Sequence, residues 1–165
     1  MSVTYHRIGG GQRVGEIALV DATLLASRAL LGVVARSMIE ALTEVTLPQF
    51  RVLVVVSGAG QIRIGDLAAR MGAVQSTFSR SVQRMVSAGW LNRTPSPDSR
   101  REIVITITAK GQALVDQVTA SRRTELARIL SALSEEEQVA LTVAFDTFTH
   151  AAGEIPLHDL LTIGL

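Results

Sequence analysis

The sequence predicts a mainly helical protein that carries one small β-hairpin. Aromatic residues make up only 4% of the 165 residues, so the core must be built from Leu, Val, Ile and Ala, which favours packed helices. Apolar residues recur at helical spacing along much of the chain, whereas residues 102–106 alternate between the two sides of a strand. With 47% apolar and 19% charged residues, the composition is that of a folded globular chain.

Residues 16–45 predict one long first helix, because they contain no Pro and their apolar residues follow the helical period. The apolar positions are Leu24, Leu31, Val34, Met38 and Leu42. This helix is apolar around much of its circumference and must be covered on more than one side.

A second helix is expected to begin at a capping box, Thr46-x-x-Gln49, with Pro48 in its first turn. It should end near Ser57, because Gly58 and Gly60 break the pattern. A short strand at residues 62–64 and a short helix between Gly65 and Gly72 follow.

Residues 74–88 predict a helix with two different faces. One stripe is apolar and consists of Phe78, Val82 and Met85. The opposite face is polar and carries Gln75, Ser76, Thr77, Ser79, Arg80, Gln83 and Arg84. Trp90, which follows, is expected to pack in the core where this helix meets the hairpin.

The hairpin is predicted from strand-like residues 91–94 and 102–106, joined by a turn-rich loop with charges at its tip. Thr108 is expected to cap a helix of about 24 residues that runs to Ala132. A second capping box, Ser134-x-x-Glu137, predicts a last helix to about Ala152.

The net charge of +1 conceals a basic central block. Residues 51–110 hold nine Lys and Arg against three acids, whereas residues 111–165 hold three Arg against eight acids. A basic block on a nearly neutral chain indicates a local surface for a polyanion. Taken without a motif, chance clustering on a solvated surface explains the block equally well.

Several function classes are excluded by residue types. There is no Cys, which excludes disulfides and thiolate metal sites, and the three His residues lie far apart without metal-ligand spacing. No nucleophile elbow or oxyanion loop accompanies the Ser, His and Asp residues, so no catalytic residues, cofactor or metal are expected. The N-terminal residues show no signal pattern and no apolar run approaches about 18 residues, which predicts a cytoplasmic protein without a membrane span.

A polar helix face beside a short packed helix is the arrangement that enters a DNA major groove. Gln75, Ser76 and Thr77 are small enough to reach base edges at the start of that helix. Arg80 lies about one turn further on, where a guanidinium can pair with guanine or a phosphate. Arg84 is expected either to contact a phosphate or to pair with Asp66, with equal support for both.

The joint pattern resembles the MarR family, the regulators named for multiple antibiotic resistance, over roughly residues 20–150. The resemblance rests on LPQFRVL, DLAARMG, STFSRSVQRMVSAGWL, and a D-S-R-R tip followed by an apolar strand and T-x-K-G. It implies a winged helix-turn-helix with its recognition helix at residues 74–88 and its wing at residues 92–106. In this family an Asp at the wing tip orients an Arg into the minor groove.

In this chain the wing-tip candidates are Asp98 with Arg100 or Arg101, and the two arginines stay open as alternatives because the span to Gly111 is one residue longer than usual. Val74 stands where family members often place a Ser or Thr cap.

The resemblance also implies a domain organisation. It places an N-terminal arm at 1–15, a helical dimerisation region at 16–46 and 109–152, a winged helix-turn-helix domain at 47–108, and a tail at 153–165. Family members often bind small aromatic or phenolic effectors in a cleft between these regions. Leu24, Leu31, Val34 and Leu53 could line such a cleft or simply form core; Tyr5 and Arg28 are the weak candidates for polar anchors.

The sequence therefore predicts a homodimeric regulator that binds an inverted-repeat operator in double-stranded DNA, more often as a repressor. The alternative is a winged-helix protein-interaction module that does not bind DNA.

Overall fold

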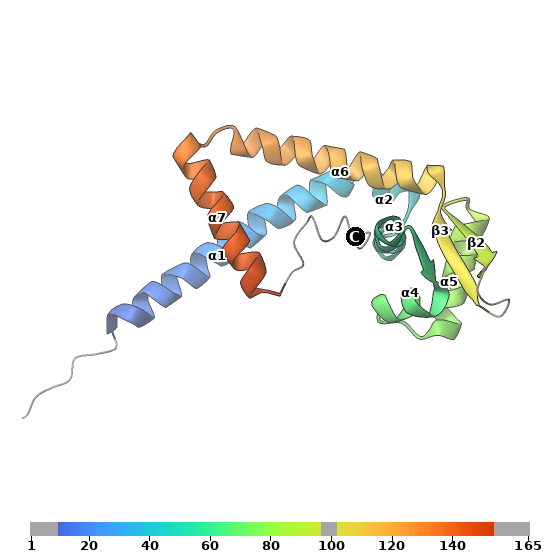
Figure 1. Ribbon diagram of the computed structural model, residues 1–165. Coiled ribbons are helices and arrows are strands. Elements are labelled where there is room, and N and C mark those ends of the chain that lie inside the picture. The colour runs from blue at the N-terminus through green and yellow to red at the C-terminus, as the bar shows by residue number, and fades with distance from the viewer. Residues whose placement is uncertain (1–9, 97–101, 154–165) are drawn as a thin grey trace, which may run out of the picture. The chain divides into compact units, whose positions relative to one another are not determined.

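The computed structural model describes residues 10–96 and 102–153 of the chain (Figure 1). Its helices and strands follow the predicted order and confirm a mainly helical fold with a small sheet. They are α1 (Gly10–Met38), α2 (Ala41–Glu44), α3 (Leu47–Ala59), β1 (Gln61–Arg63), α4 (Ile64–Arg70), α5 (Gln75–Ser87), β2 (Leu91–Pro95), β3 (Ile103–Ile107), α6 (Ala109–Leu130) and α7 (Glu135–Ala151).

The chain forms two compact units, Met1–Arg36 and Ser37–Leu165. The first unit consists of most of α1, whose large apolar side chains are largely exposed. The segment Ile17–Met38 has a mean hydropathy of 1.9 and is long and apolar enough to cross a membrane by length and composition. Asp21, Arg28 and Arg36 interrupt this segment, so it contains no uninterrupted apolar run of about 18 residues, as the sequence predicted.

The second unit is built around a three-stranded antiparallel sheet in the order β1-β3-β2. In its register Ile62 pairs with Ile105, and Arg93 pairs with Ile105 from the other side. The helices α3, α4 and α5 and the first half of α6 supply most of the remaining core, in which Leu53, Leu67 and Val82 are fully buried. Figure 1 shows α6 leaving the sheet as a long helix, with α7 attached at its far end.

The end of the first helix and the end of α3 differ from the prediction. The first helix does not run unbroken to residue 45, because Ile39 and Glu40 form a turn between α1 and α2. Tertiary contacts hold this turn: the Gln117 amide donates to Glu40 Oε2 at 2.7 Å. In α3, Gly58 does not end the helix, which continues to Ala59 and stops at Gly60, where φ is 64°.

Both predicted capping boxes are present. The Thr46 hydroxyl accepts a hydrogen bond from the backbone amide of Gln49 at the start of α3. The Ser134 hydroxyl accepts one from the backbone amide of Glu137 at the start of α7. The Glu137 carboxylate in turn accepts from the Ser134 backbone amide at 2.8 Å. Hydrogen bonds from the Ser134 backbone and hydroxyl lower the pKa of Glu137.

The T-x-K-G motif joins the sheet to α6, and each of its three defined residues has a physical role. The Thr108 hydroxyl caps α6 by accepting from the Gly111 amide at 3.1 Å. The Lys110 ammonium lies 3.7 Å from the centre of the Trp90 ring, a cation–π contact. Trp90 is buried, as predicted, and Gly111 lies directly against its carbonyl group.

Replacing Gly111 by Ala is expected to destabilise the fold by about 1–3 kcal/mol, the usual cost of overpacking. A Cβ at this position would lie 2.5 Å from the Trp90 carbonyl oxygen and 2.8 Å from Ile107 Cγ1, so backbone must shift. Urea unfolding of both proteins at one protein concentration measures the change.

The matched control is Gly65→Ala, which also adds a Cβ in the first turn of a helix. Its nearest neighbour would be the Gln75 amide at 3.8 Å, an ordinary contact. If both variants unfold at the same urea concentration, the close approach at Gly111 does not constrain the fold.

Candidate nucleic-acid interface

The candidate interface is built on α4, a tight turn and α5. The turn contains Gly72, whose φ of 61° is left-handed and suits glycine. The amides of Gly72 and Ala73 donate to the carbonyls of Ala69 and Ala68 at 3.0 and 2.9 Å and close the end of α4. α5 packs back on α4 from this turn.

α5 has one buried and one exposed face, as predicted. Phe78, Val82 and Met85 are buried. The helix begins at Gln75, one residue later than expected, because Val74 is its N-cap and makes no side-chain cap hydrogen bond. The buried stripe fixes the rotation of α5 about its axis, and so it also fixes where the polar face points.

The polar face presents the side chains that the sequence singled out for DNA contact. Gln75, Ser76, Thr77, Arg80 and Arg84 are exposed, and Ser79 is half-buried. The described residues contain no ion pair between Arg84 and Asp66, which are both exposed. The predicted pair of Arg84 with Asp66 is therefore not formed among the residues that the structure describes.

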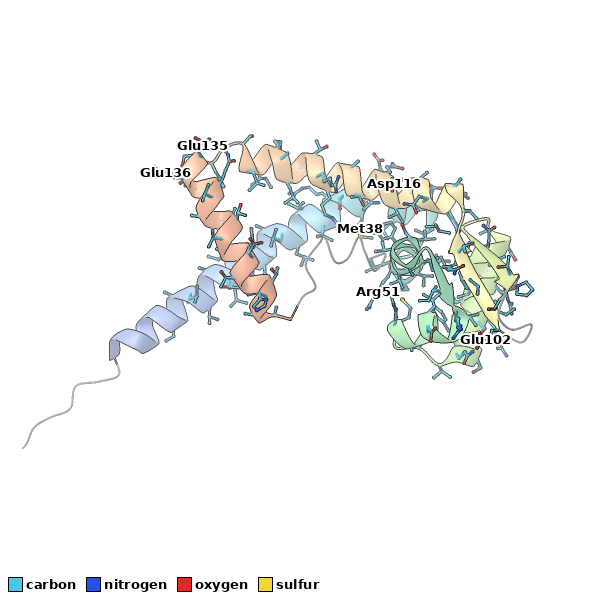
Figure 2. The ribbon with its side chains drawn as sticks, viewed as in Figure 1. Met38, Arg51, Glu102, Asp116, Glu135 and Glu136 are labelled. Atoms are coloured by element: carbon cyan, nitrogen blue, oxygen red, sulfur yellow. The ribbon has the colours of Figure 1, made fainter. Side chains whose placement is uncertain are left out.

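The wing is the hairpin of β2 and β3. The Ser96 amide donates to the Glu102 carbonyl at 2.8 Å and closes the hairpin next to its tip. Glu102, at the wing end of β3 (Figure 2), also lies 3.1 Å from Arg63 of β1 through its Oε2. This exposed pair gives Arg63 a partner within the sheet. The tip candidates Asp98, Arg100 and Arg101 lie outside the described residues.

Two contacts around α5 were not predicted. Arg93 of β2 donates from Nη1 to the Gln83 Oε1 atom of α5 at 2.9 Å. Lys110 reaches the C-terminal end of the helix, with its ammonium 3.5 Å from the Ala88 carbonyl. The basic block contained both cations, but the sequence carried no signal that paired either of them with α5.

The effector candidates are distributed over both units and the residues outside the described ranges. Tyr5 lies outside the described residues, and Arg28 is exposed on α1. Leu24 and Leu31 are also exposed on α1, whereas Leu53 is fully buried in the core of the second unit. Because Leu53 is buried, it is a core residue rather than a lining residue of a cleft. Within the described ranges, no cluster of three His, Asp or Glu side chains could hold a metal ion.

Comparison with known proteins identifies the family. The model of the MarR family matches residues 45–103. A crystal structure of RV1404 from Mycobacterium tuberculosis is 36% identical, with a TM-score of 0.78, and the match covers 93% of this chain and 100% of that one.

The chain belongs to the MarR family.

The curated MarR-type relatives are transcriptional regulators rather than enzymes, in agreement with the sequence prediction. The transcriptional repressor MdtR of Bacillus subtilis is 29% identical over 70% of this chain and 76% of its own length. The transcriptional regulator YfiV of the same organism is 28% identical over 59% of this chain, and the match spans 61% of YfiV.

Two more distant crystal structures share the fold. Streptococcus pneumoniae FabT in complex with DNA is 15% identical, with a TM-score of 0.62, over 87% of this chain and 98% of FabT. NadR in complex with 4-hydroxyphenylacetate is 18% identical, with a TM-score of 0.52, over 88% of this chain and 97% of NadR.

Proposed function

We propose that this MarR-family regulator binds an operator in duplex DNA by inserting α5 into the major groove. The observation that carries the proposal is the exposed polar face of α5, held in one orientation by its buried stripe and by α4. In this proposal the exposed side chains of Gln75, Thr77 and Arg80 read base edges, and Arg84, further along the same helix, contacts the backbone. The related fold of FabT has been crystallised with DNA, which supports the assignment.

The regulator is proposed to act as a dimer on an inverted repeat. α7 is a helix of 17 residues none of which is buried in the described subunit, whereas helices in proteins take most of their stability from tertiary packing. The exposed apolar side chains of α1 also need a cover. A second copy of the chain supplies it, so the helices at 16–46 and 109–152 form the dimerisation region and residues 47–108 form the DNA-binding domain.

The remaining parts of the proposal concern regulation. A dimer on a promoter blocks it, so the protein acts as a repressor in the cytoplasm, as the relative MdtR is a repressor. A small aromatic ligand releases it when it fixes the two domains at a spacing other than about 34–36 Å. NadR, which has been crystallised with 4-hydroxyphenylacetate, supports this ligand class.

Replacing Arg80 by Ala is expected to weaken operator binding by about 1–3 kcal/mol and to relax the sequence preference. Arg80 is exposed on the base-reading part of α5 and lies off the buried stripe, so the thermal unfolding midpoint should not change. Titration of the variant with an operator and with a scrambled duplex measures both effects.

A variant with both Arg100 and Arg101 changed to Ala provides the comparison. These wing residues are proposed to contact the backbone or a narrow minor groove, so their removal should weaken binding to both duplexes alike. If Arg80→Ala keeps the sequence preference and the wing variant abolishes it, base reading belongs to the wing. If the unchanged protein is not retained on any duplex at low salt, the chain is an interaction module and the proposal fails.

A further inference from the structure

The contact between Arg93 and Gln83 joins the two DNA-facing elements. Gln83 follows Ser76 and Arg80 at positions i+7 and i+3, so it extends the polar face of α5 by about one turn. Arg93 reaches it from β2 of the wing, at 2.9 Å between Nη1 and Oε1. Both side chains are exposed, and within residues 10–96 and 102–153 neither makes another hydrogen bond or ion pair.

The chemistry of the contact decides what it presents to solvent. A guanidinium can only donate, so the Gln83 amide must turn its oxygen toward Arg93. That leaves the Gln83 amino group and the remaining guanidinium N–H groups pointing to other partners. All these groups are donors, and one of them carries a full positive charge, so the fitting ligand is an anion that only accepts hydrogen bonds.

We propose that Gln83 and Arg93 form a phosphate clamp that grips one DNA backbone phosphate where the recognition helix meets the wing. The inference rests on the proposed function and adds a residue pair and a ligand class to it. Phosphate oxygens accept several hydrogen bonds, and a planar guanidinium matches their geometry. Arg93 orients the amide, and the two side chains hold the phosphate together.

A purely structural brace between α5 and the wing would use the same hydrogen bond. Gln83→Glu separates the two roles, because a carboxylate still accepts from Arg93 and keeps the brace as an ion pair. The same change removes the amino donors and places a negative charge where the phosphate is to bind. A clamp is disabled in this variant, whereas a brace is kept.

The experiment measures binding of the full-length protein to a mixed-sequence 30-base-pair duplex at several salt concentrations. We expect Gln83→Glu and Arg93→Ala each to weaken binding about tenfold or more, the scale of one charge-assisted hydrogen bond. The slope of log affinity against log salt should fall by about one for each phosphate that the variant no longer binds. The thermal midpoint of Gln83→Glu should equal that of the unchanged protein.

Gln61→Glu is the matched control, because Gln61 is exposed on β1 and gains the same charge. The clamp requires Gln83→Glu to weaken binding clearly more than this control does. Equal effects in the two variants, or a weakening in Arg93→Ala alone, would overturn the clamp and leave a brace. If the titration of the unchanged protein shows no binding to any duplex, the proposed function fails as well.

Discussion

Duplex affinity is expected to fall about 10³–10⁵-fold when the salt concentration rises from 50 to 200 mM. In each subunit Arg80, Arg84 and Arg93 are exposed on α5 and β2, and none of them forms an ion pair within the described ranges. Together with the wing tip, two such subunits would neutralise about 6–10 phosphates, and each one releases condensed counterions.

Titrations by fluorescence anisotropy at four salt concentrations give the slope. Arg128→Gln is the control, since Arg128 lies in the last turn of α6 and pairs with Glu125 at 3.1 Å. Its slope should match that of the unchanged protein. A flat salt response in the unchanged protein would remove the electrostatic basis of the proposed interface.

The second large effect is expected at α7, where Phe148→Asp should raise the dimer dissociation constant at least about 10³-fold. Phe148 is 55% exposed in the subunit, and the proposed interface covers it. The two-fold axis would place two carboxylates in that interface, and two buried unpaired groups at about 2 kcal/mol each give this factor. An obligate interface of this kind buries about 2,000 Å² or more.

Sedimentation equilibrium at micromolar concentrations measures the assembly, and circular dichroism reports separately whether the helices remain. Thr142→Asp is the control, because Thr142 shares a polar arc of α7 with Gln138 and Asp146. It should stay dimeric. A folded, stable monomer of the unchanged protein would contradict the dimer, and an unaffected Phe148→Asp dimer would remove α7 from the interface.

The sequence predicted correctly those features of the fold that depend on residues close together in the chain. The capping boxes at Thr46 and Ser134 predicted the starts of α3 and α7 correctly, because a cap depends on residues three positions apart. The turn at Ile39 and Glu40 has neither Gly nor Pro, and Gln117, 77 residues away, holds Glu40. No pattern within the first helix could reveal that contact.

The same division applies to the candidate interface. Helical periodicity was sufficient to separate the polar face of α5 from the stripe of Phe78, Val82 and Met85. The partnership of Gln83 with Arg93 depends on how the chain turns after Gly89, and that turn brings a strand residue onto a helix face. The spacing of residues in the sequence therefore could not predict that Arg93 contacts Gln83.

Contacts between the end of α5 and the start of α6 couple the orientations of these two helices. Lys110, in the first turn of α6, holds both the Trp90 ring and the Ala88 carbonyl at the end of α5, while Thr108 donates to the Gly89 carbonyl at 2.8 Å. The 22 residues of α6 extend about 33 Å from these contacts. A sideways movement of about 3 Å at the far end of α6 tilts this helix by about 5°, and α5, which is bonded to its near end, must tilt with it or lose those contacts.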